Sequence, residues 1–220
     1  MKPELLTSTA LKSHGAPAAP IDTRPLVAVL VPSQEDWKGA MAMAMCQMMI
    51  WSQRFCKPII ANELGSSISW SRNALTKRAL DIKAEYMLFV DSDMIFPHDA
   101  LGRLLSHQKA VVGATYARKR PPYVMLGEMI GEEKTGLIEA KVLPAGFLLV
   151  DLREIRGIPG PWWFEAYEPN EKQPFRSEDT GFCDLVRNNG FQIWCDMDLS
   201  YEIGHFGSTV VKLQRPEAPK

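Results

Sequence analysis

The sequence has no excess of charge of either sign and no long apolar run. Its 25 Lys and Arg residues nearly balance 26 Asp and Glu residues, which leaves a formal net charge of −1. A chain this close to neutral has no broad basic field, which argues against a dedicated DNA-binding protein but still allows a local basic cleft. No apolar stretch approaches the roughly 20 residues that a membrane-spanning helix needs, and residues 1–20 lack the apolar segment of a secretory signal. We therefore expect a cytoplasmic protein without an integral membrane segment.

Cysteines at metal-binding spacing are also missing. The chain has four cysteines, none of them in a C-x-x-C pair: Cys46, Cys56, Cys183 and Cys195. This excludes a zinc knuckle, and scattered thiols in a chain of 220 residues fit a reducing compartment better than a disulfide scaffold. Hydrophobic residues make up 46% of the chain and charged residues 23%, which is typical of a globular protein with a substantial core.

In the first half of the chain, short apolar runs alternate with segments rich in helix-forming residues. We expect strands at 26–31, 57–62, 86–90 and 110–113, and helices at 38–51, 69–80 and 97–107. The first two helices follow their strands directly, and Pro97 stands where the first residue of the third helix is expected. This alternation predicts an α/β fold with a parallel sheet and helices on both of its faces.

The second half is less regular. An apolar strand at 143–150 is interrupted near its start by Pro144, and another strand is expected at 191–195. Ser177 is a candidate N-cap for a helix from Glu178 to about residue 188, where Gly190 ends it. We expect a flexible N-terminal tail at 1–24, a single domain at 25–210 and a C-terminal tail at 211–220.

Two carboxylates, Asp91 and Asp93, follow the expected strand at 86–90. Side chains at the carboxyl end of such a strand reach the crevice where open α/β sheets bind their ligands. Paired carboxylates suit Mg²⁺ or Mn²⁺, which also takes oxygens from a diphosphate. Turn formation or helix capping explains such a pair equally well, and a second pair, Asp196 and Asp198, follows a later strand. The position after an early central strand favours the first pair as the metal site.

Other polar residues stand where a site would need them. His205 lies between two glycines, and imidazole is a common metal ligand. Glu178 and Asp179 begin a helix, where Asp179 is a candidate base and where carboxylates are also favoured by the helix dipole alone. Arg72 and the basic cluster at 118–120 are candidates for phosphate contacts, although basic side chains often simply face solvent.

Six of these segments occur in a fixed order along the chain. They are Pro32-Ser33, Ser71-Arg72-Asn73-Ala74-Leu75, Phe89-Val90-Asp91-Ser92-Asp93-Met94, Pro144-Ala145-Gly146-Phe147-Leu148-Leu149-Val150, Ser177-Glu178-Asp179-Thr180-Gly181-Phe182-Cys183 and Glu202-Ile203-Gly204-His205-Phe206-Gly207. The ordered set, which spans residues 26–207, resembles the GT-A glycosyltransferases of the family 2 kind found in bacteria and phages. The resemblance implies a single-domain GT-A fold, with a mixed, mostly parallel central sheet flanked by helices.

The same resemblance implies a role for each candidate residue. A divalent metal, manganese or magnesium, would be held by Asp91, Asp93 and His205, and Asp179 would be the base. The residues that would bind a nucleotide-sugar donor are Pro32, Ser33, Arg72, Asp91, Ser92, Asp93, Ala145 and Gly146. Trp162, Trp163 and Glu178 would contact the acceptor, although the two tryptophans could instead anchor a hydrophobic lid. The Asp that relatives carry late in the second strand is not evident, since Asn62 and Glu63 lie there, so uridine and guanosine donors both stay open.

The expected reaction is a single displacement that inverts the sugar's anomeric configuration, with retention as the alternative. The acceptor stays open among a glycan, a protein, a small molecule and a modified base of phage DNA. Two other functions remain: a nucleotidyltransferase that makes a nucleotide sugar, and a non-catalytic nucleotide-sugar-binding protein on the same fold. The first usually carries a Gly-rich loop after its first strand, and residues 31–36 lack one.

Overall fold

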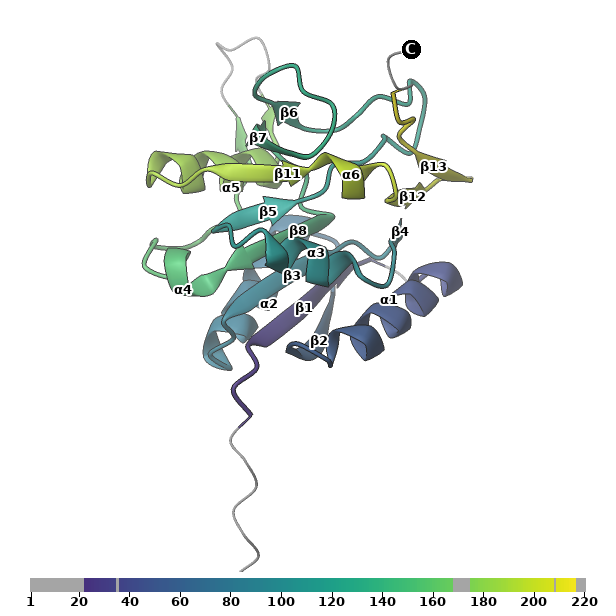
Figure 1. Ribbon diagram of the computed structural model, residues 1–220. Coiled ribbons are helices and arrows are strands. Elements are labelled where there is room, and N and C mark those ends of the chain that lie inside the picture. The colour runs from purple at the N-terminus through teal and green to yellow at the C-terminus, as the bar shows by residue number, and fades with distance from the viewer. Residues whose placement is uncertain (1–21, 35, 168–174, 208, 217–220) are drawn as a thin grey trace, which may run out of the picture.

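A computed structural model describes residues 22–34, 36–167, 175–207 and 209–216 of the chain (Figure 1). Its centre is an eight-stranded sheet with the order β2-β1-β3-β8-β5-β11-β7-β6. These strands are β1 (Leu26–Ser33), β2 (Lys57–Leu64), β3 (Tyr86–Val90), β5 (Val111–Gly113), β6 (Glu128–Met129), β7 (Leu137–Val142), β8 (Phe147–Asp151) and β11 (Ile193–Asp196). The strand directions confirm a mixed sheet in which six strands run the same way and β7 and β8 run opposite to them.

Helices cover both faces of this sheet, which confirms the expected fold class (Figure 1). They are α1 (Gly39–Ser52), α2 (Ile68–Asp81), α3 (Ala100–Ser106), α4 (Leu152–Ile155), α5 (Glu178–Asn188) and α6 (Met197–Ser200). Strand β1 shows how the layers form: Val27, Val29 and Val31 pack toward α1 and α3, while Ala28 and Leu30 pack toward α2, α4 and α5. Alternate residues of a strand point to opposite faces, so a strand that is apolar throughout is buried on both.

Two small sheets complete the fold. One has the order β13-β12-β4, formed by β4 (Met94–Ile95), β12 (Gly204–Phe206) and β13 (Val210–Lys212), and the other pairs β9 (Ala166–Tyr167) with β10 (Phe175–Arg176). Strand β13 spans the predicted boundary between the domain and the tail at 211–220, and Arg215 pairs with Asp198. Of the predicted flexible tail at 1–24, residues 1–21 lie outside the described residues.

The predicted helix at 97–107 begins later than expected, at Ala100. The reason is β4, in which Met94 pairs with His205 and Ile95 with Gly204 of β12, so the chain after β3 is extended before it turns into α3. Pro97 precedes the helix instead of opening it. This difference matters for the site, because the same pairing places His205 beside the Asp91–Asp93 segment.

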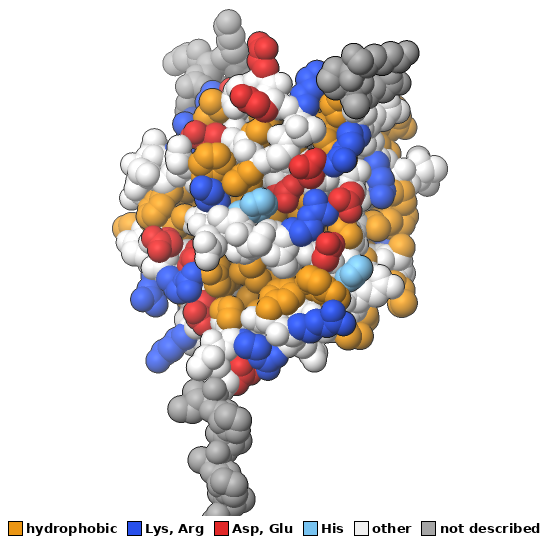
Figure 2. Space-filling view, in the orientation of Figure 1, with side chains coloured by type: hydrophobic (Ala, Val, Ile, Leu, Met, Phe, Trp, Pro, Cys, Tyr) orange, Lys and Arg blue, Asp and Glu red, His pale blue; other side chains and the backbone are white. Residues whose placement is uncertain are grey.

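The helix caps agree with the sequence. Ser67 caps α2 by accepting a hydrogen bond from the Trp70 backbone N–H, and Ser177 caps α5 by accepting one from Thr180. Asp196 of the second acidic pair caps α6, which is the structural role that the sequence left open for it. Among the described residues, no helix has the length and apolarity to cross a membrane. Figure 2 shows basic and acidic side chains interspersed over the visible face, with no field of one sign.

Candidate active site

The main cleft lies where the order of the strands switches direction. From β1 the chain passes through α1 to β2 on one side, then through α2 to β3 on the other side of β1. Ligands of open α/β sheets bind at such a switch point, outside the carboxyl ends of the strands. Here the cleft has a volume of about 950 Å³, and Pro32 and Ser33 from β1 and Asp91, Ser92 and Asp93 after β3 line it. This is the size of a ligand-binding site.

Arg72 of α2 is the buried centre of one wall. Its side chain is 3% exposed, and its guanidinium lies over the rings of Phe89 and Trp163. Nη1 donates to the Ala145 carbonyl at 3.1 Å, and Nη2 donates to Asp91 Oδ1 at 3.2 Å. Burial by itself lowers the pKa of Arg72, but the charges of the neighbouring carboxylates outweigh it and raise the pKa above its usual value. Arg72 is thus a permanently charged anchor for the acidic residues, and its head group faces those residues and not open solvent.

Asp179 faces the same guanidinium from the first turn of α5. Its Oδ1 lies 3.7 Å from Arg72 Nη2, too far for a hydrogen bond, and this buried oxygen has no hydrogen-bond partner among the described residues. Burial raises the pKa of Asp179 to about 7; Arg72 opposes this effect, and the nearby charges of Glu178 and Asp91 add to it. The side chain remains 23% exposed and lines the cleft. A carboxylate with a pKa near neutrality and access to the cleft suits proton transfer.

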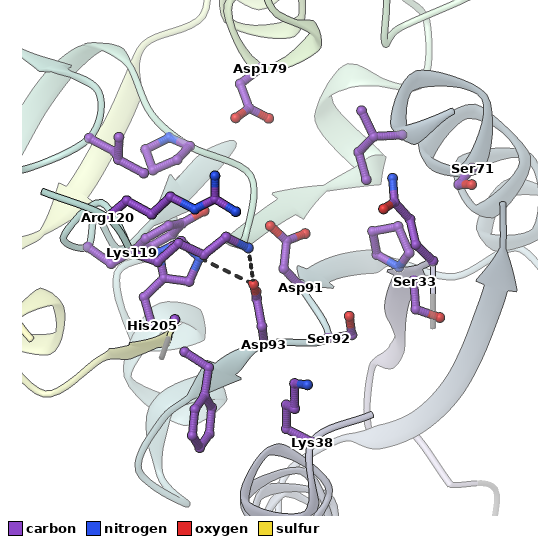
Figure 3. Close-up of a pocket in the computed structure, with 18 of the residues that line it drawn as sticks. Ser33, Lys38, Ser71, Asp91, Ser92, Asp93, Lys119, Arg120, Asp179 and His205 are labelled. Carbon is purple, nitrogen blue, oxygen red and sulfur yellow. Dashed lines mark hydrogen bonds and ion pairs between the residues drawn. The ribbon is translucent and has the colours of Figure 1, made fainter. Parts of the chain in front are cut away.

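Asp93 and His205 face each other across the cleft floor (Figure 3). His205 Nδ1 lies 2.9 Å from the Ala117 carbonyl, which only accepts, so Nδ1 carries a proton. Nε2, the other ring nitrogen, lies 3.5 Å from Asp93 Oδ2. Lys119 Nζ contacts the same oxygen at 2.5 Å. Burial raises the pKa of Asp93, but the contacts with His205 and Lys119 outweigh it and lower the pKa.

These contacts test whether the predicted metal site fits. Because Nδ1 of His205 donates to Ala117, Nε2 is the ring nitrogen that faces Asp93 and that would coordinate a cation shared with it. Asp91 is held differently, since its Oδ1 accepts from Arg72. Among the described residues, no group of three or more His, Cys, Asp or Glu side chains is arranged to hold a metal ion. A cation here would have Asp93 and His205 as its protein ligands and would need its other ligands from a diphosphate and water.

The predicted contacts of Ala145 and Gly146 with the donor sugar need correction. Ala145 is fully buried, and its carbonyl accepts from Arg72. Gly146 donates its N–H to the hydroxyl of Tyr116 at 3.1 Å. A Cβ at Gly146 would lie 2.2 Å from that hydroxyl and 2.8 Å from Asp91 Oδ2. Both residues thus lie behind the cleft wall, where the small size of Gly146 lets Tyr116 and Asp91 approach, and the neighbouring Pro144 lines the cleft instead.

The predicted role of Trp162 and Trp163 as an acceptor surface is also corrected. Their exposures are 3% and 1%, so neither indole offers a face to a sugar ring. Trp163 stacks on Phe182 with ring centres 4.3 Å apart, and its Nε1 donates to Thr76 Oγ1 at 2.9 Å. The two indoles anchor the loop after α4 to the core, which is the alternative that the sequence left open.

Glu178 does line the cleft, although its main contact is with Arg72, whose Nε lies 3.5 Å from Glu178 Oε1. Asn62 and Glu63, which replace the Asp expected in β2, have other partners. Asn62 donates to the Val31 carbonyl and to Ser33 Oγ, and Glu63 pairs with Arg78. Asn62 thus orients Ser33 at the end of β1.

Several residues of the cleft were missed by sequence reasoning or left without a definite role, among them Lys38, Tyr116, Arg120 and Tyr123. Lys38 and Arg120 form no ion pair with a described residue in the structure. Figure 3 shows Lys38 at the start of α1 and Arg120 on the side of Asp179, so the two lie on different sides of the Asp91–Asp93 segment. Burial raises the pKa of Tyr116 well above its usual value, so its hydroxyl stays protonated. The basic cluster at 118–120 was a signal for Arg120, whereas no pattern in the sequence marks Tyr116 or Tyr123.

Comparison with known proteins identifies structures of similar fold but no family. No family model and no curated protein matches the sequence. Among solved structures, A197 from STIV has a TM-score of 0.58 and 13% identity, with 88% of this chain and 97% of A197 covered. That likeness shows the fold alone.

Two further structures are more distant. A glycosyltransferase involved in glycosylation of the major capsid of PBCV-1 has a TM-score of 0.36 and 12% identity, covering 63% of this chain and 70% of its own. A protein from Bacillus anthracis named as a glucose-1-phosphate thymidylyltransferase, in complex with a sucrose, has a TM-score of 0.43 and 8% identity, covering 80% of this chain and 92% of its own. At these scores neither carries an argument about this chain.

Proposed function

We propose that the protein is a glycosyltransferase that moves a sugar from a nucleotide-diphosphate donor to an acceptor hydroxyl. The observation that carries the proposal is the convergence of Asp91, Asp93, His205 and Asp179 on one cleft. Asp91 and Asp93 follow β3, His205 lies in β12 and Asp179 is in the first turn of α5, and the cleft lies at the switch point of the sheet. A site that combines a diphosphate-binding floor with a carboxylate of raised pKa suits sugar transfer.

The donor would bind with its nucleotide toward Pro32 and Ser33 and its diphosphate over the Asp91–Asp93 segment. Lys38 and Arg120, which have no carboxylate partner among the described residues, supply positive charge for the diphosphate. A divalent metal, manganese or magnesium, held by Asp93 and His205 would act there as a Lewis acid that neutralises charge on the leaving diphosphate. Asp91 stays fixed by Arg72 at the edge of this region.

Asp179 would be the base of a single displacement. Its carboxylate takes the proton of the acceptor hydroxyl while the acceptor oxygen attacks the anomeric carbon. The bond from that carbon to the diphosphate oxygen breaks, and the nucleoside diphosphate leaves with the electron pair. Attack from the side opposite the leaving group inverts the anomeric configuration. Arg72 keeps Asp179 next to the site, and the remaining exposure of Asp179 lets an acceptor reach it.

Thermal unfolding with a panel of UDP- and GDP-sugars, each with Mn²⁺ and with EDTA, tests the donor site. A ligand that binds only the native state raises Tm by mass action. We expect one nucleotide sugar to raise Tm with Mn²⁺ and not with EDTA, and we expect the shift to be lost in Asp93→Asn. A panel that leaves Tm unchanged at millimolar concentrations would rule out the donor site.

A second assay supplies the protein with a nucleoside triphosphate and a sugar phosphate. Release of pyrophosphate in that assay would instead identify a nucleotidyltransferase. Donor binding without transfer to any acceptor and without donor hydrolysis would identify a binding protein.

A further inference from the structure

A second hollow adjoins the main cleft at Tyr123. Its volume is about 580 Å³, and it lies between Tyr123 and the segment Thr209–Gln214, which includes β13. Tyr123 lines both spaces, so its ring stands where they meet.

A second chain segment also joins the two spaces. Phe206 and Gly207 line the cleft, and the chain that follows them lines the hollow from Thr209 onward. Gly207 lies against the loop that leads to Tyr123: a Cβ there would be 2.5 Å from the Lys119 carbonyl. The hollow is therefore a continuation of the cleft away from β1, whose end would hold the nucleotide. Asp179 and Tyr123 both line the cleft, so a bound chain that extends from Asp179 to Tyr123 would enter the hollow.

The lining of the hollow indicates what such a chain is made of. The Tyr123 ring is 55% exposed, and Val210, Val211 and Leu213 add apolar surface. Thr209 and Gln214 offer neutral hydrogen-bonding groups, and Lys212 is the one charged residue of this lining. A ligand with apolar faces and many hydroxyls, which is to say a sugar, matches this combination.

The main macromolecular rivals match it less well. A nucleic acid gains much of its affinity from several phosphate contacts with Lys and Arg, and this lining supplies one such side chain. An extended peptide could add to the outer edge of β13, but β13 is three residues long and offers few backbone hydrogen bonds.

We propose that the second hollow is an acceptor subsite that holds the sugar unit next to the one bearing the attacked hydroxyl. The acceptor is accordingly an oligosaccharide of at least two units, with Tyr123 stacked against the sugar that crosses from the cleft to the hollow. This inference rests on the proposed glycosyltransferase function and assigns the substrate class and a specificity-determining residue to that site.

A glycan array probed with the full chain tests the subsite. The array carries single sugars and neutral oligosaccharides of two to four units, and a single-stranded DNA decamer and unstructured peptides are printed beside them. We expect binding to at least one oligosaccharide that exceeds binding to its terminal single sugar by about tenfold or more, which corresponds to about 1.4 kcal/mol.

Variants separate the hollow from the cleft. Tyr123→Ala should lower this oligosaccharide binding about tenfold, and so should the double variant Lys212→Ala/Gln214→Ala, whose two exposed side chains line the hollow and not the cleft. Tyr167→Ala, on β9 and 70% exposed, is the matched control and should leave binding unchanged. The double variant and Tyr167→Ala, whose residues lie outside the cleft, should keep the thermal shift by the donor.

The donor-induced shift in Tm distinguishes a failure of the subsite proposal from a failure of the proposed function. A chain that shows the donor shift but binds single sugars as well as oligosaccharides, or binds no glycan, contradicts the subsite and leaves the transferase proposal standing. Binding of the DNA or of peptides that is lost in Tyr123→Ala contradicts the assignment to glycans. If no nucleotide sugar shifts Tm, the transferase proposal fails, and the subsite fails with it.

Discussion

The guanidinium of Arg72 on α2 lies 3.2 Å from the carboxylate of Asp91 at the end of β3. The same guanidinium also faces Asp179 and Glu178 at the start of α5. One buried cation thus contacts both parts of the site. These are the region where the donor diphosphate is expected and Asp179, the residue proposed as the base. Burial raises the pKa of Asp179 despite this basic neighbour, and the charges of Glu178 and Asp91 add to the effect.

We predict that Arg72→Met destabilises the protein by about 3–5 kcal/mol, because removing one partner of a buried ion pair leaves uncompensated buried charge. Urea unfolding at pH 7 measures this loss. The control is Arg78→Met on the same helix, whose Arg78 side chain is 53% exposed and pairs with Glu63; that variant should cost less than about 1 kcal/mol. Equal effects of the two variants would show that Arg72 does not hold the acidic cluster together.

We predict that Asp179→Asn lowers the rate of transfer by about 10²–10⁴-fold, the range typical of a lost general base. The donor-induced shift in Tm should persist, because Asp179 is not proposed to bind the donor. In the wild type, kcat/KM should rise with pH up to about 7, where Asp179 becomes ionised. Asp184→Asn, on the same helix, is the control, and transfer by Asp179→Asn at the wild-type rate would refute the assignment of the base.

The raised pKa of Asp179 also predicts how stability depends on pH. A folded-state pKa near 7, above the value of 3.8 that an exposed Asp has, means that the native state binds the proton more tightly than the unfolded state does. Its contribution to stability is fully present below about pH 4 and is lost as pH rises through 7. The free energy of unfolding of Asp179→Asn relative to wild type should therefore increase between pH 5 and pH 8. Urea titrations across this range measure it, and a constant difference would contradict the raised pKa.

We predict that Gly146→Ala abolishes most activity, because the added Cβ would lie 2.2 Å from the Tyr116 hydroxyl and 2.8 Å from Asp91 Oδ2, so at least one of these groups must move. Gly157→Ala is the matched control, since nothing lies within 4 Å of a Cβ there. Transfer rates and the donor shift of both variants measure the effect. Full activity in Gly146→Ala would mean that the positions of Tyr116 and Asp91 do not matter for transfer.

We predict that Trp163→Ala costs about 3–5 kcal/mol of stability, the usual cost of truncating a buried aromatic side chain. Trp163→Phe keeps a ring against Phe182 but loses the hydrogen bond to Thr76, so it should cost less. KM for the acceptor should be unchanged in Trp163→Phe, because the indole is 1% exposed. A rise in KM with stability unchanged would restore the acceptor role that the sequence suggested.

Much of the fold was predictable because it follows from local patterns. The apolar run of β1 and the Ser177 cap of α5 each reflect preferences of a few neighbouring residues, and the structure has both elements close to the expected bounds. The order of the motifs also indicated that Asp91, Asp93, His205 and Asp179 belong to one site. In the structure, all four of these side chains line one cleft.

The tertiary structure decided what depends on contacts between distant segments. The pairing of β4 with β12 delays α3 and brings His205 beside Asp93, although 112 positions in the chain separate them. Burial turns Trp163 into a core anchor, and places Ala145 and Gly146 behind the cleft. The sequence alone determined six of the eight strands of the central sheet, the three longest helices and the identity of the acidic residues, because hydrophobic periodicity and capping act over a few residues. Only the packed fold could set which of these side chains face the cleft and how Arg72 and burial tune Asp179, because burial and charge proximity depend on segments far apart in the chain.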